Sequence, residues 1–346
     1  MKITLIVTTG RTGSDYLQRC LDGLNGLIVF SDKFNYHQFF ENDNQRINSE
    51  ILLRKFLEKY SYLFKEIKIE NIKIKFSIKK FKKNFMQLSK NKLTNRKQFF
   101  LLLYKSYHLT CGKKLSKTQN VIHHSHGVNN TIQALKDFPN AKILITVRHP
   151  LMNLKSGLYN WFRYKKSTIS MKRVFFYVYR IRQDLMYLNS LKNRKFFIKL
   201  EEANNKAVKK KLCNFLNIKY QKNIFKASIL GKPWIGDKVS SKNSAQGRYI
   251  NPGDGKDVLK FFEKKEIKLL NYIFMDYKKF GYNLKTISSL SFFMNIFYLY
   301  SFEKYTFKNA KNKSFLSNIL YLSYRYLFFI LILFKLDKLL KRIHLT

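Results

Sequence analysis

Two stretches of this chain combine small, hydroxylated and basic side chains in the way that phosphate-binding loops do. The first follows an apolar run at residues 3–8 and reads GRTGS over residues 10–14. β-Branched residues that stop at a glycine predict a buried strand entering a turn, and the apolar spacing that follows predicts a helix. The N-terminus of such a helix offers free backbone N–H groups and a positive dipole end to an anion. Arg11 adds charge, and Thr12 and Ser14 add hydroxyl donors, so the stretch predicts a phosphate site.

The second stretch, in the middle of the chain, also ends an apolar run with a basic residue. Residues 138–142 read FPNAK, residues 143–147 are apolar or β-branched, and Arg148 follows shortly before Pro150. Proline cannot continue a central strand, so we expect the strand to end here and a helix to follow, with Ser156 about two turns into it. A basic residue at the carboxyl end of a strand and a hydroxyl on the next helix can meet at the edge where open α/β sheets bind ligands.

Together the two stretches resemble the nucleotide-binding elements of the sulfotransferases that use 3′-phosphoadenosine 5′-phosphosulfate (PAPS) and release 3′-phosphoadenosine 5′-phosphate. In that family a Lys or Arg precedes Ser/Thr-Gly-Ser/Thr, and a later apolar strand ends in Arg, one further residue and Pro. The resemblance implies that the 5′ end of the nucleotide is held by Arg11, Thr12, Gly13 and Ser14. It implies that Arg11 also stabilises charge on the bridging oxygen, and that Arg148 and Ser156 hold the 3′-phosphate.

The resemblance covers residues 1–40 and 118–283. It implies one domain over residues 1–283 with a P-loop-like sulfotransferase fold, a three-layer α/β/α arrangement around a mostly parallel sheet. A late loop of this family closes over cofactor or substrate, and the matching residues here are Ser244, Gly247 and Arg248. Residues 41–117 match no part of the family. They are Lys-rich with apolar residues at helical spacing, so we expect two or three amphipathic helices. In the family the insertion between the two nucleotide loops forms much of the acceptor site, and the resemblance implies the same role here.

Sulfuryl transfer needs a base that takes the proton of the acceptor hydroxyl. In one branch of the family the base is a His at the end of a strand, and by resemblance His126 takes this place at the end of a strand predicted over residues 120–125. Alternation along a strand puts His124 on the same face as His126, and His123 on the other face as a packed or surface residue. Other branches use a carboxylate nearer the N-terminal helix, and the alternatives here are Asp32, Glu41 and Asp43. No metal is expected, because these histidines lack the spacing of a zinc motif.

The chain has 346 residues and a formal net charge of +46. An abundance of Lys, Asn, Ile, Phe and Tyr is typical of an AT-rich genome, which accounts for part of this charge; the rest favours attraction to PAPS, acidic glycans or anionic lipid rather than to a specific nucleic acid. Three cysteines fit a reducing cytoplasm and no disulfide framework. The chain opens directly with the first predicted strand, so we expect no secretory signal.

The composition changes after residue 283, and residues 284–346 form an aromatic and basic tail. Residues 315–334 are mostly apolar and are followed by several basic residues, a pattern that favours the cytoplasmic side of a membrane or an anionic headgroup layer. Arg325 near the middle argues against a span, so we expect a tail that lies on the inner face of a membrane. The alternative is a helical pair packed on the domain.

The sequence therefore predicts a cytoplasmic enzyme that transfers a sulfuryl group from PAPS to a hydroxyl acceptor, a sugar of a glycan or a lipid-linked sugar. One alternative is a P-loop-like kinase of small molecules, which would carry a Lys at the position of Arg11 and an Asp that holds Mg²⁺. The other is a non-catalytic basic module that binds a membrane or nucleic acid, which would bind with a steep dependence on salt and no preference among nucleotides.

Overall fold

The computed structural model describes residues 1–64, 67–69, 72–74, 76–90, 92–115, 119–160, 171–229, 232–234, 260–309 and 315–336. The chain divides into two compact units, each of which is described by itself. The first unit comprises Met1–Thr8, Gly13–Val147 and Lys192–Ile250, and the second comprises Thr9–Thr12, Arg148–Leu191 and Asn251–Thr346.

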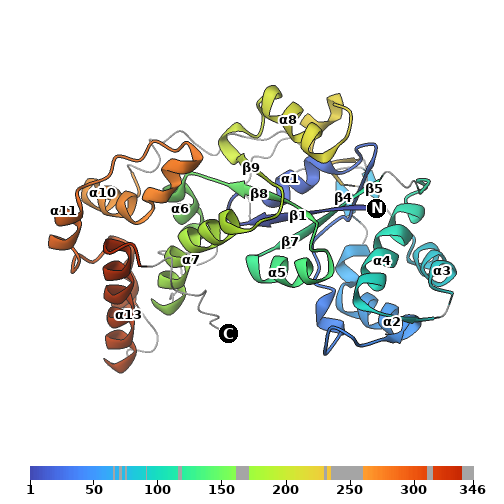
Figure 1. Ribbon diagram of the computed structural model, residues 1–346, viewed down its shortest axis with the longest axis horizontal. Coiled ribbons are helices and arrows are strands. Elements are labelled where there is room, and N and C mark those ends of the chain that lie inside the picture. The colour runs from blue at the N-terminus through green and yellow to red at the C-terminus, as the bar shows by residue number, and fades with distance from the viewer. Residues whose placement is uncertain are drawn as a thin grey trace. The chain divides into compact units, whose positions relative to one another are not determined.

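A five-stranded sheet forms the centre of the first unit (Figure 1). Its order is β2 (Leu27–Val29), β7 (Asn120–His126), β1 (Lys2–Thr8), β8 (Lys142–Val147) and β9 (Lys195–Lys199). Every neighbouring pair is parallel. The near-continuous apolar runs at β1 and β8 suit a parallel sheet that is covered on both faces.

Helices cover both faces of this sheet. On one face, Ile6, Ile122 and Leu144 share a buried core with α1 (Ser14–Leu21) and α8 (Lys206–Leu216). On the other, α5 (Val128–Asp137) packs on β1 and β7, and α4 (Arg96–Thr110) packs on β2. Figure 1 shows α5 on the side of the sheet opposite α1 and α8. The predicted three-layer α/β/α arrangement with a parallel sheet is therefore confirmed.

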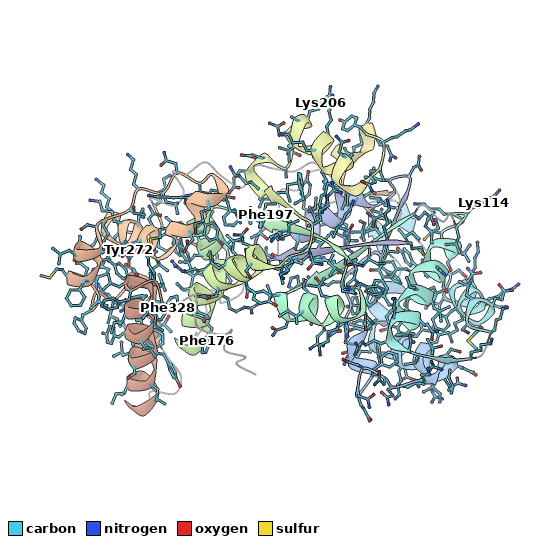
Figure 2. The ribbon with its side chains drawn as sticks, viewed as in Figure 1. Lys114, Phe176, Phe197, Lys206, Tyr272 and Phe328 are labelled. Carbon is cyan, nitrogen blue, oxygen red and sulfur yellow. The ribbon has the colours of Figure 1, made fainter. Side chains whose placement is uncertain are left out.

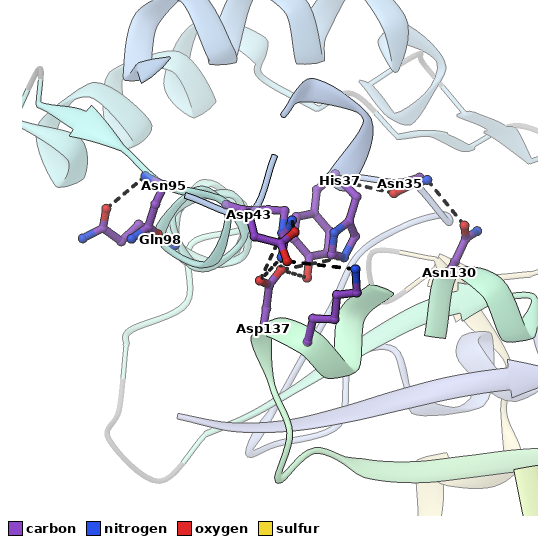
Figure 3. A network of polar contacts seen from close by, with 10 residues as sticks. Asn35, His37, Asp43, Asn95, Gln98, Asn130 and Asp137 are labelled. Atoms are coloured by element: carbon purple, nitrogen blue, oxygen red, sulfur yellow. Dashed lines mark hydrogen bonds and ion pairs between the residues drawn. The ribbon is translucent and has the colours of Figure 1, made fainter. Parts of the chain in front are cut away.

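The insertion at residues 41–117 contains the predicted amphipathic helices, which are α2 (Ser49–Lys59), α3 (Ile78–Ser89) and α4. Side chains of Asn48, Ser77 and Asn95 cap their N-termini, and Gln98 completes a capping box (Figure 3). Two short antiparallel pairs join them, β3 (Ile47–Asn48) with β6 (Leu93–Thr94) and β4 (Ile67–Ile69) with β5 (Ile72–Ile74).

A buried ion pair fastens this insertion to the sheet layer. Arg96 at the start of α4 donates from Nη2 and Nε to the carboxylate of Asp137 at the end of α5, at 2.7 and 2.8 Å (Figure 3). The hydroxyl of Tyr36 donates to the same carboxylate at 2.8 Å, and Asp43 is ion-paired with Arg96. A bidentate Arg–carboxylate contact with additional hydrogen bonds is a strong, directional link. Asp43, one of the alternative bases, is engaged in this network.

Shorter elements complete the first unit. The 3₁₀ turns are η1 (His37–Phe39), η2 (Ser61–Phe64), η3 (Leu200–Glu202) and η4 (Lys222–Phe225), and the hairpin pairs β10 (Ser228–Ile229) with β11 (Lys232–Pro233).

Helices make up the described part of the second unit. They are α6 (Pro150–Asn160), α7 (Met171–Ser190), α10 (Lys264–Ile273), the 3₁₀ turn η6 (Met275–Phe280), α11 (Ser289–Met294), α12 (Ser301–Asn309) and α13 (Phe315–Leu333). The helix α7 contacts α6, α12 and α13. Gly157 allows α6 to approach α7 closely, because a Cβ at this position would lie 2.1 Å from the ring of Tyr177 on α7. Phe328 of α13, which is labelled in Figure 2, packs edge-on against Tyr179 of α7.

The C-terminal helix is fixed to its unit by a buried charge. Arg325 donates from Nε to Glu303 of α12 at 2.7 Å and from Nη1 to the carbonyl oxygen of Ile296 at 2.9 Å, and its guanidinium lies 4.4 Å from the centre of the Phe329 ring. The inward face of α13 thus packs on the protein, as the alternative of a packed helical pair predicts. In the part of the chain that the structure describes, no helix is both long and apolar enough to cross a membrane.

Glu303→Ala tests this buried pair. The substitution leaves the Arg325 charge buried without its counter-ion, so we expect the free energy of unfolding to fall by about 3–5 kcal/mol. Urea denaturation followed by circular dichroism measures the change. Glu58→Ala, which removes an exposed carboxylate from α2, is the control and should change stability by less than about 0.5 kcal/mol. Equal effects of the two substitutions would refute a structural role for the pair.

Candidate functional site

The three strands from which the chain continues into the predicted motifs are adjacent in the sheet. β1 pairs with β7 on one side and with β8 on the other, and all three run in the same direction. Their carboxyl ends therefore lie at the same edge, where α/β sheets bind ligands. The chain continues from these ends into residues 9–13, into Gly127 and into Arg148. Residues 9–12 and 148–160 belong to the second unit, and the rest of the candidate residues described below belong to the first.

In the second unit, the loop at residues 9–12 is held by Asn153 of α6. The backbone N–H of Arg11 donates to Asn153 Oδ1 at 2.9 Å, and Asn153 Nδ2 donates to the carbonyl oxygen of Thr9 at 3.2 Å. Gly10 has φ +125°, and a Cβ there would lie 2.8 Å from Asn153 Oδ1. Only glycine fits this backbone conformation and this close approach. The amide of Asn153 thus fixes the backbone that carries the Arg11 side chain.

Asn153 is itself buried and held in orientation. The hydroxyl of Tyr177 on α7 donates to Asn153 Oδ1 at 2.7 Å, and it lies 3.0 Å from the carbonyl oxygen of the same residue. The sequence prediction did not include Asn153 or Tyr177. A signal for Asn153 was present, because it is a polar residue between Leu151 and Leu154 in the segment that joins Arg148 to Ser156.

The same loop brings the two predicted motifs together. Arg148, which is buried, donates from Nη1 to the carbonyl oxygen of Arg11 at 3.3 Å, although the two residues are 137 positions apart. Ser156 lies on α6 one turn after Asn153 and is half-buried. Arg148 and α6, the helix that carries Ser156, therefore both contact the backbone of this loop. The Arg148 guanidinium adds positive charge beside the backbone of this loop, which favours an anion there.

In the first unit, α1 begins directly after the loop. Gly13 is its N-cap residue with φ +78°, and a Cβ there would lie 2.3 Å from Leu200 Cδ1. Gly13 has no side chain with which to cap the helix, so no N-cap side chain accepts a hydrogen bond from the first N–H groups of α1. These N–H groups are the donors that the sequence assigned to a phosphate.

The histidines of β7 lie as the sequence predicts. The pairing of β1 with β7 shifts between Ile6 and Val7, which oppose His124 and His126, and His126 adopts φ +64°. The two histidine rings lie 5.4 Å apart on one side of the sheet. His123 lies on the other side, where its Nδ1 is 2.9 Å from the hydroxyl of Tyr104. A bulge and a left-handed non-glycine residue at the end of a strand are typical of functional sites.

The hydrogen bonds of His124 define its tautomer. Gln18 Nε2 donates to the carbonyl oxygen of Phe30 at 2.8 Å, so Gln18 Oε1 faces His124 Nδ1, which lies 2.8 Å away. The proton must then be on Nδ1, and Nε2 carries a lone pair. Burial lowers the pKa of His124 to about 3, so the ring is neutral at pH 7. Within the described residues, Nε2 is buried without a hydrogen-bond partner.

Asp15, in the first turn of α1, is a carboxylate that the sequence prediction missed. Its Oδ1 lies 3.2 Å from Lys33 Nζ and 3.6 Å from His124 Nδ1. Burial opposes ionisation, but His124 and Lys33 lower its pKa below the ordinary value, and His126 contributes to this shift. Its sequence signal was an acidic residue in the first turn of the predicted helix, directly after the GRTGS stretch.

The remaining predicted residues differ in how far the structure places them. Asp32 Oδ2 lies 3.9 Å from Arg19 Nη2, and Glu41 is exposed. Ser244, Gly247 and Arg248 lie outside the described residues, so their contacts with the cofactor stay predictions. Within the residues that the structure does describe, no group of three or more His, Cys, Asp or Glu side chains is placed to hold a metal ion.

The chain was compared with known proteins. It matches no protein-family model and no curated protein. Similar solved structures are sulfotransferase domains. One from the curacin biosynthetic pathway has a TM-score of 0.46 and 16% identity, over 82% of this chain and 99% of that one. One from the olefin synthase of Synechococcus PCC 7002 has a TM-score of 0.43 and 16% identity, over 82% of this chain and 96% of that one. The sulfotransferase STF9 from Mycobacterium avium has a TM-score of 0.36 and 12% identity, over 82% of this chain and 78% of that one. Values this low do not assign an activity to this chain.

Gly13→Ala tests the close packing at the start of α1. The Cβ would meet Leu200 in a backbone conformation that L-residues avoid, so we expect a loss of about 2–5 kcal/mol in the free energy of unfolding. Gly112→Ala is a matched control, because Gly112 has φ +77° and nothing within 4 Å of its Cβ position. Gly112→Ala should lower the free energy of unfolding by only about 1–2 kcal/mol, the cost of a left-handed backbone conformation for an L-residue. Equal losses in urea denaturation would show that Leu200 does not restrict this position.

The buried histidines predict a loss of stability in acid. Burial lowers the pKa of His123 to about 3, while in the unfolded chain it is about 6.5. Between these values only the unfolded chain binds the proton, so stability is full above about pH 6.5 and falls as the pH drops toward about 3. His123→Phe should reduce the slope of unfolding free energy against pH in this window by about 1.4 kcal/mol per unit.

The control for this measurement is Phe34→Leu, which alters the same aromatic cluster without removing a titrating group. It should lower stability equally at every pH. If His123→Phe left the slope unchanged, the ring would not be buried in the neutral form.

Proposed function

We propose that this protein transfers a sulfuryl group from PAPS to a hydroxyl acceptor. The observation that carries the proposal is the hydrogen bond from Arg148 Nη1 to the carbonyl oxygen of Arg11. It joins the two stretches that resemble the 5′- and 3′-phosphate elements of one enzyme family. A nucleotide with phosphate at both ends needs both elements in one place, whereas a basic membrane or nucleic-acid module has no need of this pairing.

The described residues fit such a nucleotide. Gly10 allows the loop backbone to pack closely on Asn153, Gly13 does the same against Leu200, and α1 starts without a side-chain cap on its N–H groups. In the proposal the 5′ end is held by Arg11, Thr12, Gly13 and Ser14, and Arg148 and Ser156 hold the 3′-phosphate. PAPS supplies an activated sulfuryl group. Arg11 neutralises the charge that develops on the bridging oxygen, since its position is fixed by Asn153 before the reaction begins.

His126 is the proposed base, with Nε2 of neutral His124 as a neighbouring hydrogen-bond acceptor. His126 is half-buried, whereas the side chain of His124 is fully buried, so His126 is the more accessible of the two. The carboxylate of Asp15 lies close enough to His124 to stabilise a positive charge on this pair of rings. Among the carboxylate alternatives, Asp43 is less suited as a base because it is ion-paired with Arg96.

The acceptor is proposed to be a hydroxyl of a sugar, either in a glycan or linked to a lipid. The insertion that contains α2, α3 and α4 is the proposed acceptor side, and it is fastened to the sheet layer through Arg96 and Asp137. We also place the protein in the cytoplasm, peripherally on the inner face of a membrane. Ser244, Gly247 and Arg248 remain proposed contacts of the late loop.

Calorimetric titration with 3′-phosphoadenosine 5′-phosphate, AMP and ATP tests the proposal. We expect the first nucleotide to bind at least about a hundredfold more tightly than AMP, because Arg148 would form a charge-assisted hydrogen bond with its 3′-phosphate. Arg148→Ala should abolish this preference and leave AMP binding nearly unchanged. Arg54→Ala, which removes an exposed guanidinium from α2, is the control for net charge and should leave the preference intact.

Two outcomes would contradict the proposal. Equal or absent binding of the three nucleotides would favour the basic module. Preferred binding of ATP that requires magnesium would favour the kinase.

A further inference from the structure

The outward face of α13 is apolar, which reverses the usual pattern of a surface helix. Its exposed residues are Ile319, Leu320, Ser323, Tyr324, Leu327 and Ile330, and Phe334 directly after its end is also exposed. Leu327 is 52% exposed and Phe334 is 64% exposed. The charged Arg325 instead points inward to Glu303. A helix on a soluble surface normally turns its charged residues to water and its apolar stripe to the core.

A second exposed apolar cluster adjoins this helix. Leu290, Phe293 and Met294 of α11 are exposed, and so is Phe297 just beyond it, with Met294 74% and Phe297 73% accessible. The Phe297 ring packs against Tyr326 of α13 at 5.0 Å between ring centres. The two clusters therefore form one surface, which we name the α11–α13 face. Contiguous exposed apolar surface of this kind marks a docking site.

The charges around the α11–α13 face are basic. Lys265 and Lys304 lie over the Tyr298 ring, next to Phe297, at 4.6 and 5.1 Å from its centre. Lys335 is exposed at the C-terminal end of α13. In the described residues from 260 onward, the carboxylates of Glu266, Asp276 and Glu303 are buried, and Glu263 is exposed. Three of these four carboxylates are thus turned inward, while the exposed Glu263 accepts hydrogen bonds from Tyr298 and Ser301. Among the exposed charges beside the apolar surface, the ammonium groups of Lys265, Lys304 and Lys335 outnumber this one carboxylate.

We propose that the α11–α13 face docks on an anionic phospholipid bilayer, with α13 lying in the plane of the headgroup layer. Aliphatic and aromatic side chains enter the acyl boundary, and the bordering lysines contact lipid phosphates. A second copy of the chain fits less well, since it would bring the same basic border against itself. The proposal does not depend on sulfuryl transfer, because it rests on the second unit's surface alone.

Vesicle flotation of the full chain tests this docking. The probes are vesicles of phosphatidylcholine alone and of equal parts phosphatidylcholine and phosphatidylglycerol. We expect partition into the anionic vesicles to be at least about tenfold stronger and to weaken with added salt. The double substitution Leu320→Ser and Leu327→Ser should weaken it by a further tenfold or more, because both leucines are already exposed and contribute to binding rather than folding.

The matched control is Leu93→Ser with Leu115→Ser, which removes two exposed leucines from the first unit. It should leave partition unchanged, and circular dichroism should show all variants folded. Lys265→Gln with Lys304→Gln should reduce binding to anionic vesicles only. An equal loss of vesicle partition in the two leucine double variants, or no binding to either kind of vesicle, would overturn the proposal. Dimers in light scattering that the substitutions at 320 and 327 abolish would assign the face to a second copy instead.

Discussion

The pairing of β1 with both β7 and β8 is the constraint on which the candidate site depends. A parallel strand has its carboxyl end beside those of its neighbours, so the register Thr8↔Thr146 and Val7↔His126 determines where three chain segments leave the sheet. Residues far apart in sequence then start from one edge. The long insertion does not change the order of these strands, because the chain enters it after β2 and re-enters the sheet at β7.

Around that edge, backbone groups are fixed by buried polar side chains rather than by apolar packing. Asn153 accepts from one side of the loop at residues 9–12 and donates to the other, and Gln18 does the same between Phe30 and His124. An amide is suited to this role, since it carries a donor and an acceptor on one planar group. Both amides are buried, so each hydrogen bond is costly to break and the loop and the imidazole keep one orientation.

The sequence was sufficient for features that depend on local pattern. The strands, the helix starts and the Arg11 and Arg148 stretches follow from apolar periodicity, glycine positions and proline, and the amphipathic helices of the insertion follow from helical spacing. Asn153 and Asp15 were missed because their roles come from tertiary contacts, with the 9–12 loop and with Lys33 and His124. The position of Asn153 between two leucines and that of Asp15 in a first helical turn make them candidates, but only the fold shows which groups they contact.

The sequence alone does not show whether Arg325 faces water or the protein interior; its partner Glu303 shows this. In an apolar run, an arginine argues against a membrane span and equally argues for a helix that faces water. Glu303 decides between inward and outward orientation, because a buried guanidinium needs a carboxylate and Glu303 lies on the adjoining helix α12. Once Arg325 is turned inward, the 3.6-residue period forces Leu320, Tyr324 and Leu327 outward. The ion pair that stabilises the helix is thus also the cause of its exposed apolar face.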